Sequence, residues 1–367
     1  MVVVAFISLG ILFYTYVGYP ALVVLWAKLA PRSARGREGY EPMVSVCLPV
    51  HDGAKYVGAK IRNIQELEYP KEKLEILVFS DGSTDATADI VAEAAASDER
   101  IRLLSSCQRC GKPTALNRMR AVAAGEVLLM CDVRQPFATG ALRALLRELS
   151  DPLVGCSSGS LVQLGQTGAS AYGRYEHAIR GSESQAGSMV GVAGSIYAIR
   201  RVDMPVVPPD VLLDDMFVPL RVALSQGKRI VLAKGADAYD EACDDAREFP
   251  RKVRTLAGNY QLIGLMPSLL VPIVNPVWFQ LASHKLLRLA CPWALVALFV
   301  SSGSLAFAGA AEPWRAFFLA QVAFYALSAL GPAVGLPGTV ARTFVVLNAA
   351  AVVGLWKFVR GTQAVTW

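Results

Sequence analysis

The sequence predicts an α/β domain with a mainly parallel sheet, held between α-helical transmembrane segments at the two ends of the chain. Hydrophobic residues make up 54% of the 367 residues, more than an ordinary soluble enzyme carries. Charged residues are nevertheless abundant, and nearly all of them lie between about residue 31 and residue 288. Within that charged region, strand-like runs alternate with helical stretches, an order typical of a parallel sheet covered by helices on both faces.

The N-terminal segment is predicted to cross a membrane. Residues 2–28 are almost uninterrupted apolar residues, long enough to span the roughly 30 Å hydrocarbon layer. A signal peptide is the alternative, but the stretch lacks a basic region before it and is too long for a typical apolar core. Basic side chains follow at once, at Lys28, Arg32 and Arg35, so the positive-inside rule puts this end in the cytoplasm. We expect a transmembrane helix over residues 1–30.

The middle of the chain alternates between β-rich and helical patterns, and we expect a soluble domain over residues 40–255. Short apolar, β-branched runs predict strands, and the longer stretches between them have helical character. Strands are expected at 44–48, 74–79, 101–104 and 126–131, and helices at 54–67, 84–96 and 112–124.

The C-terminal part again contains apolar stretches of near-spanning length. They lie at about 289–308, 314–333 and 339–358, which predicts about three transmembrane helices over residues 289–360. Before them, an apolar region is interrupted by several prolines. We interpret residues 256–288 as interfacial helices rather than as another span.

The expected orientation places the middle domain in the cytoplasm. His284, Lys285 and Arg288 precede the first C-terminal stretch, in agreement with the basic residues that follow the N-terminal one. We therefore expect a multi-pass protein of the inner (cell) membrane. Counting spans puts the C-terminus outside, whereas Lys357 and Arg360 favour the inside, and the sequence leaves that conflict open.

Charge and cysteine content narrow the classes of partner. The net charge of +6 fits either anionic lipid headgroups or phosphorylated substrates, or it reflects only the positive-inside flanks. No basic stripe with interleaved aromatic residues occurs, so no nucleic-acid partner is predicted. The seven cysteines are scattered, which suits a reducing cytoplasm.

Acidic residues follow several of the expected strands, where ligands bind in open α/β sheets. His51 and Asp52 follow the first strand, Asp81 follows the second, and Asp132 ends another. A single such acid is commonly a turn or helix-cap residue, and Asp85 is interpreted in that way. Three strands that bring acids to one edge of the sheet indicate a site.

The phosphate-binding loops of two large enzyme classes are absent from the sequence. No GxGxxG follows the first strand, and no GxxxxGK[ST] occurs anywhere, which disfavours a dinucleotide oxidoreductase or a P-loop ATPase. Phosphates would have to be met by a metal or by basic side chains. The cations available for this are Arg109, Lys112, Arg251, Lys252 and Arg254.

Several segments occur in the order known from one family of membrane enzymes. They are VSVCLPVHDGAKYVGAKIRNI at 44–64, YPKEKLEILVFSDGSTDAT at 69–87, RCGKPTALN at 109–117, EVLLMCDVRQPF at 126–137, GVAGSIYAIRR at 191–201, LLDDMFVPLRV at 212–222 and FPRKVRTLAGNYQL at 249–262. In these segments the chain resembles the family-2 glycosyltransferases, the group that contains cellulose, chitin and hyaluronan synthases. The resemblance implies a GT-A (nucleotide-diphospho-sugar transferase) fold for residues 40–255 and a hexosyltransferase type of activity.

The resemblance implies a donor site for a nucleotide-diphospho-sugar. Asp81 would hydrogen-bond the nucleoside, beside the loop that contains Pro49, His51 and Asp52. Lys112 would help to hold the base or the diphosphate. Asp132 matches the first acid of the family's DxD motif, which holds a divalent cation, Mg²⁺ or Mn²⁺, against the diphosphate.

The resemblance also implies a catalytic pair and an acceptor site. Asp215 matches the general base that deprotonates the acceptor hydroxyl, and Asp214 occupies the place of the preceding acid. The competing interpretation is that the pair only caps a helix over residues 216–223. Gly194 and Ser195 fall in the acceptor-binding loop, where small residues leave room for a sugar.

Two departures from the family pattern affect the expected chemistry. The DxD motif reads Asp132-Val133-Arg134, so a cation replaces the second acid, and Arg134 is expected to contact phosphate. The segment that corresponds to QxxRW keeps Arg251 and Arg254, which can bind diphosphate, but has lost the tryptophan that stacks on an acceptor sugar. A single transfer is then at least as well supported as processive polymerisation.

We therefore expect an inverting transfer of a sugar to a membrane-associated saccharide or lipid-linked acceptor, in exopolysaccharide or cell-envelope glycan synthesis, with the lipid bilayer as a further partner. One alternative is a polyprenyl-phosphate glycosyltransferase, whose phosphate acceptor needs little help from a base. Another is a catalytically weak subunit that binds a nucleotide sugar in a polysaccharide export complex.

Overall fold

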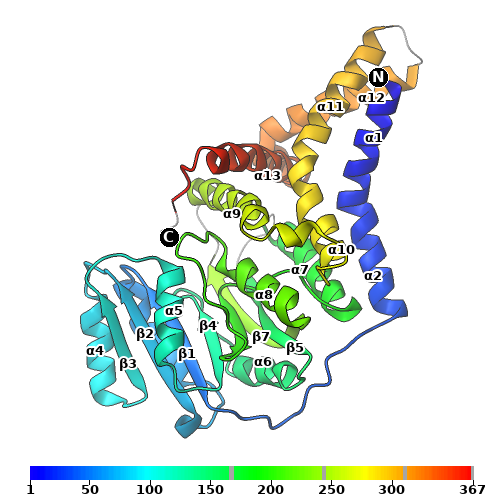
Figure 1. The fold of residues 1–367 in the computed structure, drawn as a ribbon. Helices are drawn as coiled ribbons and strands as arrows, with labels where there is room; N and C mark the ends of the chain where they lie inside the picture. The colour runs from blue at the N-terminus through cyan, green and yellow to red at the C-terminus, as the bar shows by residue number, and fades with distance from the viewer. Residues whose placement is uncertain (165–168, 242–244, 309–311, 365–367) are drawn as a thin grey trace.

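The fold is an α/β domain from which a group of long helices projects (Figure 1). The computed structural model describes residues 1–164, 169–241, 245–308 and 312–364. Over these residues the domain contains a seven-stranded sheet with the strand order β3-β2-β1-β4-β6-β5-β7. The expected α/β class with a mainly parallel sheet is confirmed.

The first half of the sheet is parallel and follows the sequence pattern closely. Its strands are β1 (Val44–Val50), β2 (Leu74–Asp81), β3 (Ile101–Ser106) and β4 (Val127–Cys131). Every residue of β1, β2 and β4 is buried, as expected for strands covered on both faces. The carboxyl ends of these strands therefore meet at one edge.

The second half of the sheet contains a reversed strand that brings a distant loop to the same edge. β6 (Ile196–Arg200) pairs antiparallel with β4, with Ile196 opposite Cys131. Its other neighbour, β5 (Val154–Leu164), is parallel to β7 (Arg229–Glu241). Because β6 runs the other way, it begins where β4 ends, and the loop that precedes β6 lies beside Asp132.

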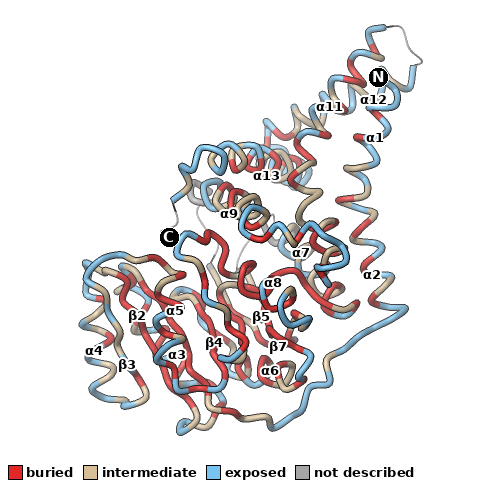
Figure 2. The backbone as a smooth tube through the Cα atoms, in the orientation of Figure 1, coloured by how far each residue is buried: buried red, intermediate tan, exposed pale blue. Residues whose placement is uncertain are grey.

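Helices cover both faces of the sheet (Figure 2). One buried cluster joins the sheet to α5 (Lys112–Val122) and α8 (Asp214–Gln226). The opposite cluster joins it to α3 (Ala54–Gln65), α4 (Thr87–Ser97) and α6 (Ala141–Leu149). The observed helices lie within a few residues of those predicted, because their apolar spacing follows the helical period.

Two helices connect the sheet to the projecting helices. They are α7 (Ala169–Ala186) and α9 (Asp245–Leu265), and α9 runs through the expected boundary at residue 255. A proline-rich segment follows, with a short 3-10 turn (Pro267–Leu270), exposed Ile273 and α10 (Trp278–Leu281).

Three helical segments are long and apolar enough to cross a membrane within the described residues, Val2–Leu29, Trp278–Phe307 and Glu312–Val359. The first comprises α1 (Val2–Phe13), a π turn (Tyr14–Gly18) and α2 (Tyr19–Leu29). The second comprises α10, a π turn (Ala282–Leu286) and α11 (Leu287–Phe307), and the third comprises α12 (Glu312–Leu330), a 3-10 turn (Gly331–Val334) and α13 (Gly335–Val359).

The last helix returns to the α/β domain. Figure 1 shows α13 lying across the direction of α1 and α11, alongside α9. The two helices touch at Gly354, where a Cβ atom would lie 2.9 Å from the backbone nitrogen of Ala257. The end of α13, with Lys357 and Arg360, therefore lies on the side of the α/β domain, which offers a physical solution to the conflict between span count and basic residues.

This arrangement predicts which side of the membrane the C-terminus occupies. With the exposed Cys107 replaced by serine, Thr362→Cys should react with a membrane-impermeant maleimide from the same side as Cys107 of the wild-type domain. Ala308→Cys, at the far end of α11, should react only from the opposite side. Labelling of residues 308 and 362 from the same side would contradict the arrangement.

Candidate functional site

A lysine stands between carboxylates from two different elements at the carboxyl edge of the sheet. Lys112 is the first residue of α5, and its Nζ lies 3.0 Å from Oδ1 of Asp132 and 3.4 Å from Oδ2 of Asp214. Burial alone would lower the pKa of Lys112, but the charges of Asp132 and Asp214 outweigh it and raise this pKa above its usual value. The three side chains predicted from separate motifs thus form one charged cluster.

Asp81 ends β2 and is completely buried. One carboxylate oxygen accepts a hydrogen bond from the backbone N–H of Cys110 at 2.6 Å, and the other accepts one from Gly111 at 2.9 Å. Asp81 therefore holds the loop that leads into Lys112. Each of these oxygens keeps a second lone pair, so the contact of this carboxylate with a nucleoside stays a prediction.

The loop after β1 is fixed by the loop after β2. Pro49 is buried within β1, and Nδ1 of His51 lies 2.8 Å from the carbonyl oxygen of Asp81. Asp52 adopts a positive φ of 47° and accepts the backbone N–H of Thr84 at 2.8 Å. Asp85 accepts backbone N–H groups at the start of both α3 and α4, so its interpretation as a turn or cap residue is confirmed.

Asp214 and Asp215 occupy the first turn of α8. Neither caps the helix, because the N-cap position is Leu213 and makes no side-chain cap hydrogen bond. Burial, and then the neighbouring charge of Asp214, raise the pKa of Asp215 to about 6, although Lys112 and Arg180 oppose the shift. A partly buried carboxylate with such a pKa has the properties of a general base.

The loop that precedes β6 surrounds Asp215. The backbone N–H of Val192 donates to the carbonyl oxygen of Asp215 at 3.0 Å. A Cβ atom at Gly194 would lie 3.4 Å from Oδ2 of Asp215, in van der Waals contact, so a side chain at this position would lie against the carboxylate. Ser195 is buried beside it, and its Oγ makes no hydrogen bond within the described residues.

Arg180, on α7, was not singled out by the sequence. It donates to Oγ of Ser158 at 3.1 Å, and the same Oγ accepts the backbone N–H of Ala193 at 2.9 Å. Arg180 thus supports the loop around Asp215 and supplies positive charge near it. It lies in a helix with no recognisable motif, so only its position in the fold reveals it.

The remaining predicted cations are more peripheral. Arg134 is exposed on the loop after β4, and Arg251 is exposed on α9. Arg254 is partly buried on the same helix. Lys252, between these two arginines, and Thr255, directly after them, line a cavity between α9 and the projecting helices.

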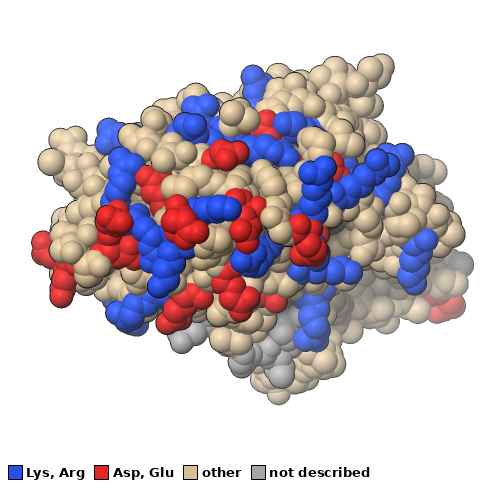
Figure 3. Space-filling view, turned by 90° about the horizontal axis from the view of Figure 1, so that it is seen from below, with Lys and Arg blue, Asp and Glu red and all other residues tan. Residues whose placement is uncertain are grey.

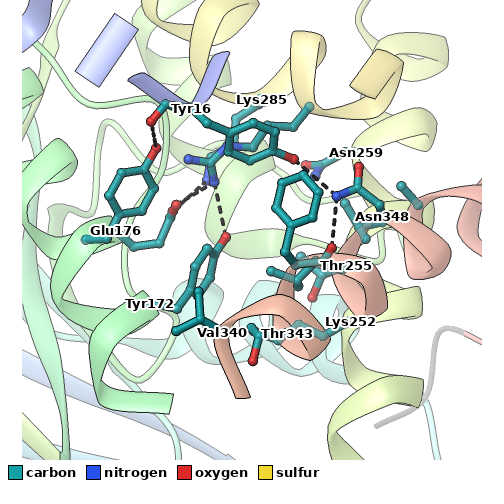
Figure 4. A pocket seen from close by; sticks show the side chains of 16 residues that line it. Tyr16, Tyr172, Glu176, Lys252, Thr255, Asn259, Lys285, Val340, Thr343 and Asn348 are labelled. Carbon is teal, nitrogen blue, oxygen red and sulfur yellow. Dashed lines mark hydrogen bonds and ion pairs between the residues drawn. The ribbon is translucent and has the colours of Figure 1, made fainter. Parts of the chain in front are cut away.

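Two adjoining cavities lead away from Asp215. The smaller, of about 210 Å³, is lined by Asp215, Arg180 and the loop before β6. The larger, of about 480 Å³, lies among α7, α9, α11 and α13 (Figure 4). Glu176, Thr255, Asn259 and Lys285 line both of them. In the sequence, Lys285 and Arg288 are recognisable only as basic residues that precede an apolar stretch, and no motif marks Glu176.

The outer face of the α/β domain carries charges of both signs. Figure 3, which views the molecule from below, shows Lys and Arg interspersed with Asp and Glu over this face. Nucleic-acid footprints are instead typically clustered basic surfaces.

A divalent cation fits this site only together with a ligand that brings its own oxygens. The described residues contain no group of three His, Cys, Asp or Glu side chains arranged to hold a metal ion. Asp132 offers one carboxylate, with a side chain 42% exposed. Mg²⁺ is commonly held by one or two carboxylates and the phosphates of a substrate, so Asp132 and a diphosphate together form a suitable donor set.

Comparison with known proteins identifies the domain. Residues 45–187 match the model of the family described as glycosyl transferase family 2. The β-monoglucosyldiacylglycerol synthase of Trichormus variabilis is 29% identical over 131 residues, which are 35% of this chain and 28% of that protein. The probable glycosyltransferase YdaM of Bacillus subtilis is 34% identical over 94 residues, which are 25% of this chain and 22% of that protein. The chain thus spans about a quarter of the length of these relatives.

A solved structure shares the fold over nearly the whole chain. It is the mannosyltransferase PcManGT from Pyrobaculum calidifontis in complex with GDP-Man and Mn²⁺. The TM-score is 0.78 at 24% sequence identity, and the match covers 98% of this chain and 100% of the other. Both the GT-A-like domain and the projecting helices take part in this likeness.

The raised pKa of Asp215 predicts a pH-dependent change in stability. The pKa is about 6 in the folded protein and about 4 in an unfolded chain, so folding stability falls as pH rises through this interval. The accumulated cost is on the order of 2 to 3 kcal/mol above about pH 7. Asp215→Asn should therefore raise Tm at pH 8 and have little effect at pH 4.

Thermal unfolding of the detergent-solubilised protein across this pH range tests the prediction. Asp210→Asn is a matched control, because its side chain is exposed, and its Tm should follow that of the wild type at every pH. A constant difference in Tm between Asp215→Asn and the wild type would contradict the raised pKa.

Proposed function

We propose that this chain acts as a family-2 glycosyltransferase, because residues 45–187 match the model of that family. It would transfer a sugar from a nucleotide-diphospho-sugar to a hydroxyl of a membrane-associated acceptor, with inversion at the anomeric carbon. The observation that carries the proposal is the position of Asp215. This partly buried carboxylate lines a cavity that adjoins a larger one among the projecting helices, and it follows Asp214 of the charge cluster around Lys112.

The reaction is a single displacement. Asp215 accepts the proton of the acceptor hydroxyl while the hydroxyl oxygen forms a bond to the anomeric carbon. The bond from that carbon to the diphosphate breaks at the same time, and the nucleoside diphosphate leaves with its electron pair. A pKa of about 6 leaves Asp215 mostly ionised at neutral pH and basic enough to take a proton.

The leaving diphosphate would be stabilised by fixed positive charge. Lys112 stands at the edge of the sheet with its charge already held in place by Asp132 and Asp214, so little reorganisation is needed as negative charge develops. Arg134, Arg251 and Arg254 are further candidates for the diphosphate. The loop with His51 and Asp52, which contact Asp81 and Thr84 of the next loop, would form the nucleoside side of the donor site.

A phosphate acceptor such as a polyprenyl phosphate is the second candidate function. The cations of the larger cavity favour an anionic group in the acceptor. A phosphate oxygen is already ionised and needs no general base, whereas Asp215 has the burial and raised pKa that a hydroxyl acceptor requires. We therefore place the hydroxyl acceptor first.

The cellular setting is proposed on the same basis. The apolar helices support a location in the cell membrane, with the α/β domain on the cytoplasmic side where nucleotide sugars are made. A role in exopolysaccharide or cell-envelope glycan synthesis agrees with the glycolipid synthase among the relatives.

Loss of the base tests the proposed function directly. Membranes that contain the protein are incubated with a panel of labelled nucleotide sugars, and transfer to lipid-extractable or polymeric product is measured. Asp215→Asn should lower the transfer rate by about 10²-fold or more, a magnitude typical of a general base. Nucleotide-sugar binding should remain within a few-fold, and Asp210→Asn should behave as the wild type. Full transfer by Asp215→Asn would refute the base assignment, and a catalytically weak subunit would show neither transfer nor donor hydrolysis.

We also propose that a divalent cation accompanies the donor. Asp132 would hold it together with diphosphate oxygens, and the ion would supply further neutralisation of the leaving group. The complex of PcManGT with GDP-Man and Mn²⁺ supports this proposal. The arginine at residue 134 removes one carboxylate from the donor set, so binding of the ion should be weak.

Restoring the missing acid should strengthen metal dependence. Arg134→Asp is expected to lower the Mg²⁺ or Mn²⁺ concentration that gives half-maximal transfer by several-fold, since a second carboxylate oxygen becomes available. Arg134→Ala serves as the control, because it removes the cation without adding a ligand. Transfer that is unaffected by EDTA in the wild type and in Arg134→Asp would show that the cation plays no part.

A further inference from the structure

The two adjoining cavities have different chemical character along their length. The smaller cavity has a volume of about 210 Å³ and is lined by Asp215. Its other polar lining residues include Asn259 and Thr255. The larger one continues from these shared residues and has a volume of about 480 Å³. A ligand that reaches Asp215 from the membrane side would pass through both.

The wall of the larger cavity carries an excess of positive charge. Among its described lining residues, Lys252, Lys285 and Arg288 are cationic and Glu176 is the single carboxylate. Burial alone would raise the pKa of Glu176, but Arg288, Lys285 and His284 outweigh it and hold this pKa well below its usual value.

These cations are only partly compensated within the protein. Glu176 forms an ion pair with Arg288 and lies 3.8 Å from Nζ of Lys285. Lys252 lies 3.7 Å from Glu248 at the outer side of α9, and burial lowers its pKa. Partly buried cations without a full set of counter-charges are costly, and an anionic ligand would offset that cost.

The opposite wall of the larger cavity is mainly apolar, with Thr343 and Asn348 as its polar residues. It is formed by one face of α13, with Val340, Phe344, Leu347 and Ala351 spaced so that they line the same side of the helix. This face belongs to a segment apolar enough to lie in a membrane, and Val340 is 51% exposed. The cavity thus has a cationic side toward α9, the second π turn and α11, and a mainly apolar side toward α13 (Figure 4).

Both π turns of the membrane helices occur at this cavity. Tyr16 lies in the first and Lys285 in the second, and both residues line the larger cavity. The hydroxyl groups of Tyr14 and Ser283 connect the two turns at 2.9 Å. A π turn interrupts regular helix geometry and commonly occurs at functional sites. Here each one brings a polar side chain to the cavity wall.

We propose that the acceptor is a phosphate-linked glycolipid bound through both cavities. Its sugar occupies the smaller cavity with the accepting hydroxyl at Asp215, its phosphate or diphosphate meets Lys252, Lys285 and Arg288, and its hydrocarbon chain leaves along α13 into the bilayer. The inference rests on the proposed function and specifies the acceptor. A neutral glycolipid would fill the same space but leave the excess positive charge of the cavity wall uncompensated.

Binding of three probes separates the parts of this proposal. Farnesyl phosphate carries both an anion and a chain, farnesol carries only the chain, and inorganic phosphate carries only the anion. The purified full-length protein in neutral detergent should bind farnesyl phosphate more tightly than either of the others. Equal binding of farnesol would overturn the anion site, and equal binding of inorganic phosphate would overturn the lipid assignment.

Variants locate the binding. Lys252→Met and Lys285→Met keep the aliphatic stems and should each weaken farnesyl phosphate binding by about tenfold or more, as loss of a hydrogen bond to a charged group does. Farnesol binding should not change. Lys357→Met is the matched control, a lysine of α13 outside the two cavities, and should have no effect. Equal weakening by all three variants would indicate general attraction to the lipid surface and would overturn the proposal.

A second kind of variant keeps the charges and removes the space. Leu347→Trp should exclude farnesyl phosphate while the Tm remains that of the wild type, which separates occupation of the cavity from misfolding. Hydrolysis of the preferred nucleotide sugar should persist in every cavity variant. If the wild type shows neither hydrolysis nor transfer, the proposed function is contradicted. If hydrolysis is normal and the variants bind farnesyl phosphate as the wild type does, only the assignment of the acceptor is contradicted.

Discussion

One partly buried lysine connects the acidic residues of the candidate site. Lys112 extends from the start of α5 to Asp132 after β4 and to Asp214 at the start of α8. The charge of Lys112 is compensated by the two carboxylates, and the carboxylates are compensated by the lysine. The positions of the three side chains therefore depend on one another. Because Asp214 is tied in this way, the first turn of α8 is fixed, and the next residue, Asp215, faces the smaller cavity.

The reversed strand β6 provides the second constraint. By running antiparallel to β4 it begins at the carboxyl edge, where the loop with Gly194 meets Asp215. On the other side of this edge, α7 and α9 connect the sheet to the projecting helices. In the proposed function, the donor site and the route of the acceptor from the bilayer meet at Asp215, as transfer between a soluble donor and a membrane-bound acceptor requires.

Much of the sheet edge could be predicted because it depends on local patterns. Buried strands are marked by apolar runs, and parallel strands must end at a common edge, so Asp81 and Asp132 were expected there. The role of Asp81 could not be predicted in detail, because its backbone partners come from Cys110 and Gly111, which only the folded loop brings near. Arg180 and Glu176 belong to a helix whose sequence carries no motif.

The sequence by itself determined the α/β class, the apolar ends and the order of the family motifs, since these follow from periodicity, composition and local residue type. Only the tertiary structure decided that α13 folds back on α9 and that the cavities join at Lys285. Both features arise from contacts between helices far apart in the chain, at positions such as Gly354, where close approach is decided by the shape of the partner surface rather than by neighbouring residues.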